Sequence, residues 1–246
     1  MNTITTALVR LNDSRQPRDP ETGILIGAEA RTLGPTDTDK AILFVHGFIG
    51  TPNNFADLPD QVAAWGWHVR VMLLPGHGTS PVDFQQTEPE ELEAAVQAEL
   101  ETLQNSYDTV VLLGHSMGGA LSTIVAAEKQ PQGLILVAPY FSITKFLGLL
   151  EVEKLADLAA PFLEWLPKPQ AMQQVKRKSV RSQLLMYNWI PMKGVRTARA
   201  LAEKAREEKY ISKLIMPVMV IHSTEDKVTD PQSSQAVYNQ IPAKEK

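Results

Sequence analysis

The sequence predicts an α/β protein built on a doubly wound, mostly parallel sheet. Two observations lead to this prediction. Short apolar runs, typical of buried strands, alternate along the chain with apolar residues at helical spacing. One such run, residues 110–113, leads directly into Gly114-His115-Ser116-Met117-Gly118. A G-x-S-x-G placed between a strand and a helix is typical of the sharp turn called a nucleophile elbow.

Apolar runs bounded by turn residues predict the strands of this sheet. They span residues 24–33, 42–45, 68–74, 110–113, 134–138 and 217–222. Helical patterns separate most of these runs, so the strands are expected to be mostly parallel.

Amphipathic patterns predict the helices. Thr51-Pro52 begins the first, and Thr87 with Glu90 forms a capping box at the second. The third opens at the elbow and stops at Pro131, and Asp230-Pro231 begins the fourth. Their apolar positions are Phe55, Leu58, Val62 and Trp65, with Gly66 as the stop; Leu92, Val96, Leu100 and Leu103; Met117, Ala120, Leu121, Ile124 and Val125; and Val237, Tyr238 and Ile241. The glutamates interpreted as a solvent-facing side of the second helix, rather than as a metal site, are Glu88, Glu91, Glu93, Glu99 and Glu101.

Residues 139–210 are predicted to form a helical cap over a core made of residues 1–138 and 211–246. The stretch between the strands that end at 138 and begin near 217 is about 80 residues long, far more than one crossover helix needs. An apolar-rich cap can exclude water and hold an apolar chain. Most of its apolar residues are expected only to pack the cap onto the sheet, so no specificity residue is predicted.

Ser116 is the candidate nucleophile. In a nucleophile elbow, glycines relieve crowding around a serine on a strained turn, which lifts its hydroxyl above the sheet edge. A serine hydroxyl is a weak nucleophile near neutral pH, so it needs a base to take its proton and a carboxylate to orient that base. Asp226 is the candidate carboxylate because it lies in the loop that leaves the last predicted strand. Glu225 and Asp230 are the alternatives, and Asp230 is expected to cap a helix.

The sequence contains five histidines, and none is assigned as the base. His46 and His77 lie in glycine-containing turns, and His68 begins a predicted strand, so structural roles are expected for them. His115 lies inside the elbow and is expected to point away from the Ser116 hydroxyl.

The base is expected after the acid, because the chain order of these groups in such a sheet is serine, acid, histidine. Residues 227–246 contain no histidine. His222 lies just before Asp226 and would reach Ser116 only with unusual geometry, as a compensating base. We expect instead that the sequence is truncated, and that a strand, a histidine loop and a closing helix are missing, on the order of 30 residues.

Four segments occur in a fixed order between residues 41 and 241. They are Leu43-Phe44-Val45-His46-Gly47-Phe48-Ile49-Gly50, Leu74-Pro75-Gly76-His77-Gly78-Thr79-Ser80, the elbow, and Ile221-His222-Ser223-Thr224-Glu225-Asp226. Together they make the chain similar to the α/β-hydrolase superfamily, and within it to the carboxylesterase and monoacylglycerol-lipase-like branch. The resemblance implies an α/β-hydrolase fold and an oxyanion hole formed by the backbone N–H groups of Phe48 and Met117.

The resemblance also implies a serine hydrolase that cleaves small carboxylic esters through an acyl-enzyme on Ser116, without a cofactor or metal. A chain that lacks only the base is expected to bind an ester and to turn it over poorly. Thioester hydrolysis and acyl transfer would use the same site and are alternatives. A non-catalytic binding protein that has kept the pocket is a third possibility.

Composition agrees with a globular enzyme, since 246 residues with 43% apolar content can bury one large core. The formal net charge is −4, and basic residues are scattered apart from Lys176-Arg177-Lys178, so no nucleic-acid surface is expected. The absence of cysteine excludes disulfides and thiolate metal sites. No apolar stretch is long enough to span a bilayer, and residues 1–20 lack the apolar region of a signal peptide, so a cytoplasmic location is expected. The oligomeric state is left open.

Overall fold

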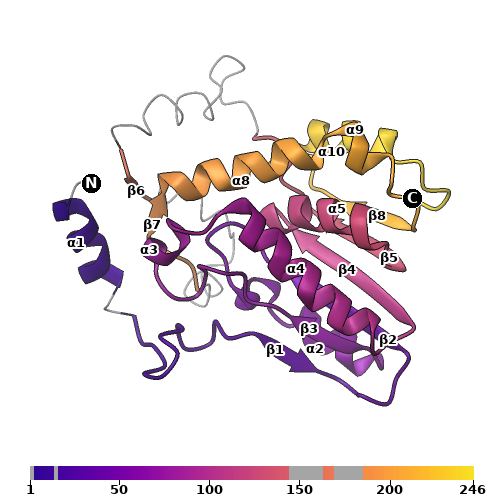
Figure 1. Cartoon of the computed structure of the whole chain (residues 1–246), viewed down its shortest axis with the longest axis horizontal. Helices are drawn as coiled ribbons and strands as arrows, with labels where there is room; N and C mark the ends of the chain where they lie inside the picture. The colour runs from indigo at the N-terminus through magenta and orange to yellow at the C-terminus, as the bar shows by residue number, and fades with distance from the viewer. Residues whose placement is uncertain (1–2, 14–15, 144–162, 169–184) are drawn as a thin grey trace.

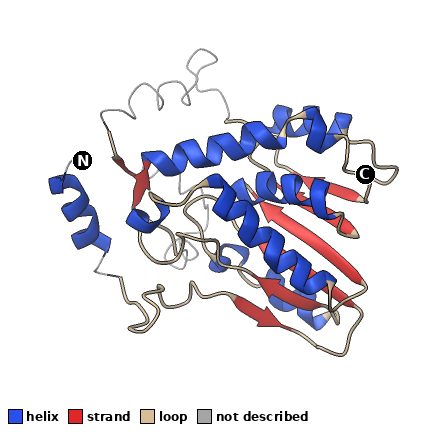
Figure 2. Ribbon diagram, in the orientation of Figure 1, coloured by secondary structure: helices blue, strands red, loops and turns tan. Residues whose placement is uncertain are grey.

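A central sheet carries helices on both faces (Figure 1 and Figure 2). The computed structural model describes residues 3–13, 16–143, 163–168 and 185–246. The strands of the sheet, in spatial order, are β1 (Arg31–Leu33), β3 (His68–Val71), β2 (Lys40–Val45), β4 (Thr109–His115), β5 (Gly133–Val137) and β8 (Val218–Ile221). β1 pairs antiparallel with β3, and the other pairings are parallel. The predicted mostly parallel sheet is confirmed.

Helices cover the sheet on both faces. α4 (Pro89–Gln104), α5 (Met117–Lys129) and α8 (Met192–Ala205) pack against one another over one face, and α2 (Leu58–Ala64) packs against β3 (Figure 1). The remaining described elements are α1 (Thr3–Asp13), the 3₁₀ helix η1 (Pro52–Phe55), α3 (Pro81–Phe84), α9 (Glu208–Ile211), α10 (Pro231–Gln240) and a separate pair of strands, β6 (Trp165–Pro167) and β7 (Trp189–Pro191).

Each face of the sheet has its own apolar core. Side chains alternate across β2, so Leu43 packs into the cluster beneath α4 and α5 while Phe44 packs with Val62 of α2 on the opposite face. Both side chains are fully buried. The sheet is therefore covered on both sides where these strands run.

The strand register aligns the carboxyl ends of the parallel strands. Val45 lies opposite Gly114, and His115 lies opposite Val137, which in turn lies opposite Ile221. The segments that follow β2, β4, β5 and β8 consequently emerge at one edge of the sheet. Ligands of open α/β sheets bind at this edge.

The predicted apolar stripe of α4 is confirmed, but the predicted start of the helix is wrong. The capping box is formed by Glu88 with Glu91, not by Thr87 with Glu90. Pro89 explains this shift, because proline favours the first helical position and the residue before it becomes the cap. The stripe is fully or almost fully buried at each predicted position, Leu92, Val96, Leu100 and Leu103.

Four of the five glutamates predicted to face solvent on α4 form ion pairs with other elements, and those of Glu88 with Lys193 and of Glu101 with Lys129 are the more exposed. Glu93 lies 2.7 Å from Lys204 Nζ of α8, and Glu99 lies 2.6 Å from Arg70 of β3. Their side chains are partly buried. This side of α4 therefore contacts neighbouring elements, which periodicity within one helix does not reveal.

The first predicted helix is divided in two. Thr51 and Asn54 form a capping box around η1, and Ala56 then takes a positive φ of 49°, which breaks the helical path before α2 begins. Trp65, predicted to share a buried face, is 69% exposed. The break turns the later positions away from the earlier ones, so their spacing no longer describes one face.

The strand predicted at 24–33 is also shorter than expected, since only Arg31–Leu33 pairs with the sheet. Gly27 has a φ of 89° and interrupts the extended path. Leu25 N–H instead donates to Gly78 O at 2.7 Å, which ties this segment to the turn after β3.

Most of the predicted cap lies outside the described residues, namely 144–162 and 169–184. The division into a core of 1–138 and 211–246 and a cap of 139–210 therefore stays a prediction. The end of that predicted cap contains α8, which packs against α5 and α4. None of the helices that the structure describes is long and apolar enough to cross a membrane.

Candidate active site

Three of the candidate residues lie around one cavity at the carboxyl edge of the sheet. Ser116 follows β4, Phe48 follows β2 and Asp226 follows β8, and all three line a cavity of about 450 Å³. The sequence separates these residues widely, and the parallel sheet brings them together. Met117, the other predicted oxyanion residue, is buried at the start of α5.

Ser116 sits on a strained turn, as predicted. Its φ of 55° and ψ of −120° are rare for a residue with a side chain, and such strain costs about 1–3 kcal/mol. Backbone hydrogen bonds hold the turn. Ser116 N–H donates to Val137 O at 3.0 Å, and Ser116 O accepts from Tyr140 N–H at 2.9 Å. β5 and the segment after it therefore fix the elbow from outside.

The two glycines of the motif are required by close backbone approach. A Cβ atom on Gly114 would lie 2.3 Å from Gly118 O, and one on Gly118 would lie 2.2 Å from Val45 O. Both distances are far below van der Waals contact. Without side chains at these positions, α5 starts directly against the ends of β4 and β2.

The loop after β2 passes directly beside Ser116. A Cβ atom on Gly47 would lie 2.9 Å from Ser116 Cβ, so only glycine allows this approach. His46 Nδ1 lies 3.0 Å from Gly47 O, and His46 Nε2 lies 3.0 Å from Leu74 N. Since Nε2 accepts from that amide, Nδ1 is the nitrogen that donates to Gly47 O. His46 thereby anchors the loop that carries Phe48.

No described residue accepts a hydrogen bond from the backbone N–H group of Phe48 or of Met117. Met117 is the first residue of α5, where an amide has no intrahelical acceptor and the helix dipole favours negative charge. The two amides stay the predicted donors of an oxyanion hole.

Hydrogen bonds from the loop that follows β8 hold the Asp226 carboxylate. Its Oδ1 accepts from Val228 N–H at 2.8 Å and Thr229 N–H at 3.1 Å, and its Oδ2 accepts from the Thr229 hydroxyl at 3.0 Å. These bonds fix the carboxylate beside the cavity. Of the two alternatives, Asp230 caps α10 by accepting from Gln232 N–H at 3.0 Å, as predicted, and Glu225 is exposed at the cavity.

His46 and His77 have the structural settings expected for them. Their rings are buried and meet edge to face at 5.0 Å. Burial, followed by the neighbouring His77, holds the pKa of His46 well below its usual range. Burial also lowers the pKa of His77 to about 4. Both rings are thus neutral near pH 7, and His68, which stacks on Tyr107, contacts neither Ser116 nor the cavity.

His115 and His222 are the two remaining histidines. His115 lines the cavity, but no hydrogen bond joins its ring to Ser116. Burial lowers the pKa of His115, and Asp226 acts in the opposite direction. His222 lies 2.8 Å from the Ser234 hydroxyl through Nδ1, and its Nε2 lies 3.2 Å from the Thr229 hydroxyl and 3.4 Å from Asp226. Both of its nitrogens are therefore engaged away from Ser116.

Lys168 is a cavity residue that the sequence analysis did not identify. It follows β6, and its side chain lines the cavity together with Ser116 and Asp226. Burial lowers the pKa of Lys168 to about 8. No sequence motif marks this lysine, because apolar content is the one signal that the predicted cap carries in the sequence.

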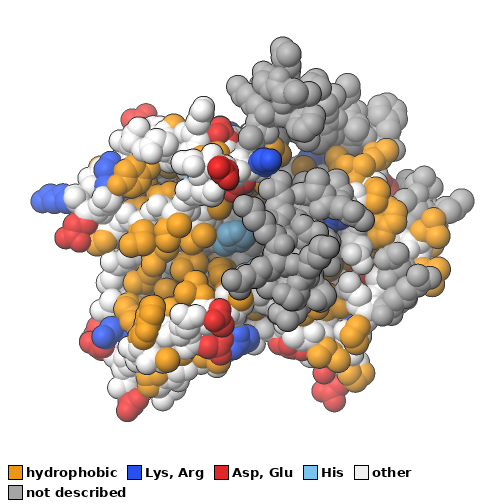
Figure 3. Space-filling view, turned by 180° about the vertical axis from the view of Figure 1, so that it is seen from behind, with side chains coloured by type: hydrophobic (Ala, Val, Ile, Leu, Met, Phe, Trp, Pro, Cys, Tyr) orange, Lys and Arg blue, Asp and Glu red, His pale blue; other side chains and the backbone are white. Residues whose placement is uncertain are grey.

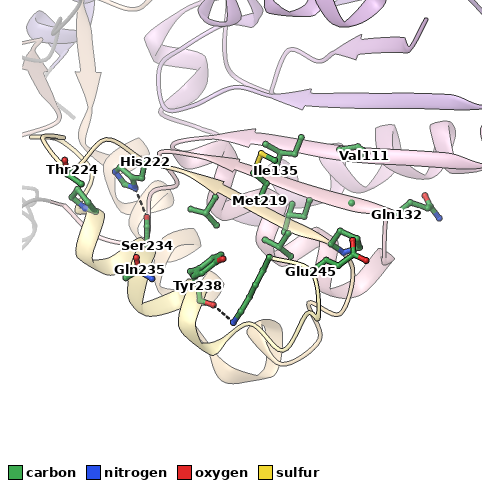
Figure 4. A pocket seen from close by; sticks show the side chains of 17 residues that line it. Val111, Gln132, Ile135, Met219, His222, Thr224, Ser234, Gln235, Tyr238 and Glu245 are labelled. Atoms are coloured by element: carbon green, nitrogen blue, oxygen red, sulfur yellow. Dashed lines mark hydrogen bonds between the residues drawn. The ribbon is translucent and has the colours of Figure 1, made fainter. Parts of the chain in front are cut away.

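A second, larger cavity of about 770 Å³ lies under β8 and contains none of the residues predicted to act in catalysis. Val111, Ile135 and Met219 of the sheet and Tyr238 of α10 line it, with His222 at one end (Figure 4). Figure 3 shows apolar side chains gathered on this side of the molecule. Its chemistry is that of an uncovered sheet face rather than of a reactive site.

Comparison with known proteins places the chain in a family. Residues 36–246 match the family described as Serine aminopeptidase, S33 (Hydrolase_4). The chain belongs to this S33 family. Among its relatives, the thermostable monoacylglycerol lipase of Bacillus sp. strain H-257 is 26% identical over 208 residues, which cover 83% of this chain and 78% of that protein. The carboxylesterase of Bacillus subtilis strain 168 is 20% identical over 210 residues, which cover 85% and 80%.

Solved structures show the same fold. The structure described as LipS and LipT, two metagenome-derived lipolytic enzymes, has a TM-score of 0.79 at 23% identity and covers 90% of this chain and 86% of that one. The monoacylglycerol lipase of Paleococcus ferrophilus has a TM-score of 0.71 at 21% identity, covering 88% and 85%. This S33-family chain is therefore an esterase- or lipase-type α/β-hydrolase, and the predicted resemblance is confirmed.

The roles of individual residues in this S33-family hydrolase stay predictions. The structure brings Ser116, Phe48 and Asp226 to one cavity and places Met117 next to Ser116 at the start of α5. Within the described part of the chain, no group of three or more His, Asp or Glu side chains is arranged to hold a metal ion.

Proposed function

We propose that the chain hydrolyses carboxylic esters, as a carboxylesterase or monoacylglycerol lipase does, through an acyl-enzyme on Ser116. The observation that carries this proposal is the strained serine at the start of α5, which lines a cavity. No described residue accepts a hydrogen bond from the nearby N–H groups of Phe48 and Met117. The S33 family and the named relatives support an ester substrate. Asp226 is proposed as the acid and Phe48 and Met117 as the oxyanion donors.

The proposed reaction has two steps. Ser116 Oγ attacks the ester carbonyl carbon, its proton passes to a base, and the carbonyl oxygen gains negative charge opposite the two amides. The intermediate then collapses, the bond to the alcohol breaks, and the base returns the proton to the alcohol. Water repeats the sequence on the acyl-serine and releases the carboxylic acid.

The proton acceptor in this reaction is the group that the described residues do not identify. No described histidine forms a hydrogen bond with the Ser116 hydroxyl. An oxyanion hole and a binding pocket alone leave about 10³–10⁴-fold catalysis over water in comparable enzymes, so activity should be measurable even with a weak base.

Labelling by a fluorophosphonate and hydrolysis of short p-nitrophenyl esters test the proposal. The expected result is a covalent adduct on the peptide containing Ser116 and ester turnover that Ser116→Ala abolishes. Ser122→Ala is the matched control, since Ser122 is buried in the same helix and its hydroxyl contacts no hydrogen-bond partner among the described residues. Binding of esters without labelling or turnover would show a non-catalytic binding protein instead.

Comparison of acyl thioesters and acyl acceptors with the same esters separates ester hydrolysis from thioester hydrolysis and acyl transfer. Asp226→Asn tests the acid, and we expect it to lower kcat at least ~10-fold. Asp230→Asn is the control, because asparagine caps a helix about as well as aspartate. Equal losses in Asp226→Asn and Glu225→Gln would remove Asp226 from its proposed role.

A further inference from the structure

Lys168 places a positive charge in the same cavity as Ser116. Among the described residues that line this cavity, it is the only lysine or arginine. Its Nζ donates to Met186 Sδ at 3.1 Å, and a thioether sulfur is a weak acceptor. No described carboxylate lies within ion-pairing distance of Lys168. The ammonium group therefore has hydrogen-bonding capacity that the described protein groups do not satisfy.

The backbone around Lys168 is held firmly. Its N–H donates to Asn188 O at 2.9 Å, which continues the pairing of β6 with β7. The segment that leads into β7 is tied to the core, because the Tyr187 hydroxyl donates to Gly76 O at 2.7 Å and Leu185 O accepts from the Thr51 hydroxyl at 3.1 Å. The lysine is thus positioned by the hydrogen-bonded β6–β7 pair.

A half-buried lysine that has no anionic partner among the described residues is unfavourable at this position unless an anion compensates its charge. Burial disfavours the ammonium form, which agrees with the lowered pKa of Lys168. Methionine or leucine would fill the space beside Met186 without this cost. A functional role therefore explains the residue better than packing does, since perturbed ionisable groups in clefts mark functional sites.

Two roles are chemically open to a lysine in this cavity: the neutral amine could act as a base, and the ammonium could bind an anionic group. A base for Ser116 must lie within hydrogen-bond reach of its hydroxyl, and no hydrogen bond joins Lys168 to Ser116. An anchor for a negatively charged part of the ligand needs only to line the cavity. The observations favour the anchor.

The acidic groups around the cavity do not neutralise this charge. Glu225 is exposed, and the oxygens of Asp226 accept hydrogen bonds from Val228 and Thr229. Neither carboxylate forms an ion pair with Lys168. An anionic group on the ligand can accordingly approach the ammonium without displacing a partner among the described residues.

We infer that Lys168 is a specificity-determining residue that selects esters carrying a carboxylate or phosphate group away from the ester bond. This inference rests on the proposed function for its reaction but not for its binding step. The anionic group belongs either to the acyl chain, as in the monoester of a dicarboxylic acid, or to the alcohol, as in an acylglycerol phosphate. A charge-assisted hydrogen bond of this kind corresponds to about tenfold in affinity.

Binding to a Ser116→Ala variant tests the inference without turnover. In the first arm, calorimetry compares monomethyl adipate with methyl hexanoate, which differ by a carboxylate in place of a methyl group. In the second arm, it compares 1-hexanoylglycerol 3-phosphate with 1-hexanoylglycerol. The quantity measured is the ratio of Kd values, neutral over anionic, in each arm.

Lys168→Met in this background is expected to lower that ratio about tenfold in at least one arm, and the arm affected identifies the anionic group. Lys227→Met is the matched control, because Lys227 is an exposed lysine on the loop of Asp226 and should leave both ratios within twofold. Ratios that Lys168→Met leaves unchanged in both arms would overturn the inference. Equal effects of the two lysine variants, or no binding of either anionic ligand, would overturn it as well.

Turnover by the chain with Ser116 intact separates this inference from the proposed function. A binding preference that depends on Lys168, with no hydrolysis of either ester, would refute the proposed function and leave the inference standing. Hydrolysis of both esters at a rate ratio that Lys168→Met does not alter would do the reverse.

Discussion

Gly118→Ala tests how tightly the elbow is packed against the loop that carries Phe48. The new methyl group would lie 2.2 Å from Val45 O and 2.4 Å from His46 O, and both are backbone atoms that cannot rotate away. Either α5 or the end of β2 has to move. Overpacking of a well-packed core typically costs 1–3 kcal/mol, and a backbone clash lies at the upper end, so we expect the free energy of unfolding to fall by about 3 kcal/mol.

The same displacement should separate the amides of Phe48 and Met117. Loss of one oxyanion donor costs about 10²–10³ in kcat, which sets the expected loss of ester turnover. Urea denaturation and p-nitrophenyl ester hydrolysis measure the two effects. Gly133→Ala is the control, because its new methyl group would meet Val111 at an ordinary 3.4 Å. A Gly118→Ala variant within 1 kcal/mol of the parent in stability and unchanged in turnover would refute the packing described for the elbow.

Three further predictions concern protons. Added imidazole should raise ester turnover by the 246-residue chain in proportion to the imidazole concentration, because a general base contributes about 10²–10⁴-fold. The Ser116→Ala variant gives the background rate. A turnover that does not respond to imidazole would show that the chain already supplies its base. The pKa of His77 is about 4 when folded against 6.5 for an ordinary histidine, so the unfolded chain binds more protons between these values and the contribution of His77 to stability should fall by roughly 3 kcal/mol as pH drops from 6.5 to 4, in addition to the contribution of His46, whose pKa is lowered as well. Urea denaturation across this range measures it, and His77→Asn should flatten the profile. The preference for anionic ligands should decline as pH rises through the pKa of Lys168, about 8, and calorimetry at pH 7 and 9 can follow this decline. The other titratable side chains that line the cavity among the described residues are Glu225, Asp226 and His115, and burial lowers the pKa of His115.

The features that the sequence predicted are set by local chemistry. The stripe of Leu92, Val96, Leu100 and Leu103 lies on one helix, and its spacing alone identifies the buried face. The elbow is equally local, because Gly114 and Gly118 are needed wherever a strand, a serine and a helix meet at such close range. Both features could be derived without knowing what packs against them.

The features that were missed depend on distant contacts. The salt bridges of Glu93 with Lys204 and of Glu99 with Arg70 join residues far apart in the sequence. Periodicity within α4 therefore predicts that these glutamates face solvent. The backbone changes direction at Ala56, which has a positive φ, and alanine is not a residue type that predicts such a break. Tertiary packing, rather than propensity, decides these positions.

Lys168 extends this reasoning from structure to function. Ser116, the proposed nucleophile, is positioned by the sheet, through its hydrogen bond to Val137 and the close approach of Gly47, whereas Lys168 is positioned by the β6–β7 pair. Changes in one set need not disturb the other, because they are held by different elements. Selectivity in this fold can then change without loss of the elbow, and Lys168→Met should alter which ester is bound while the strained turn at Ser116 persists.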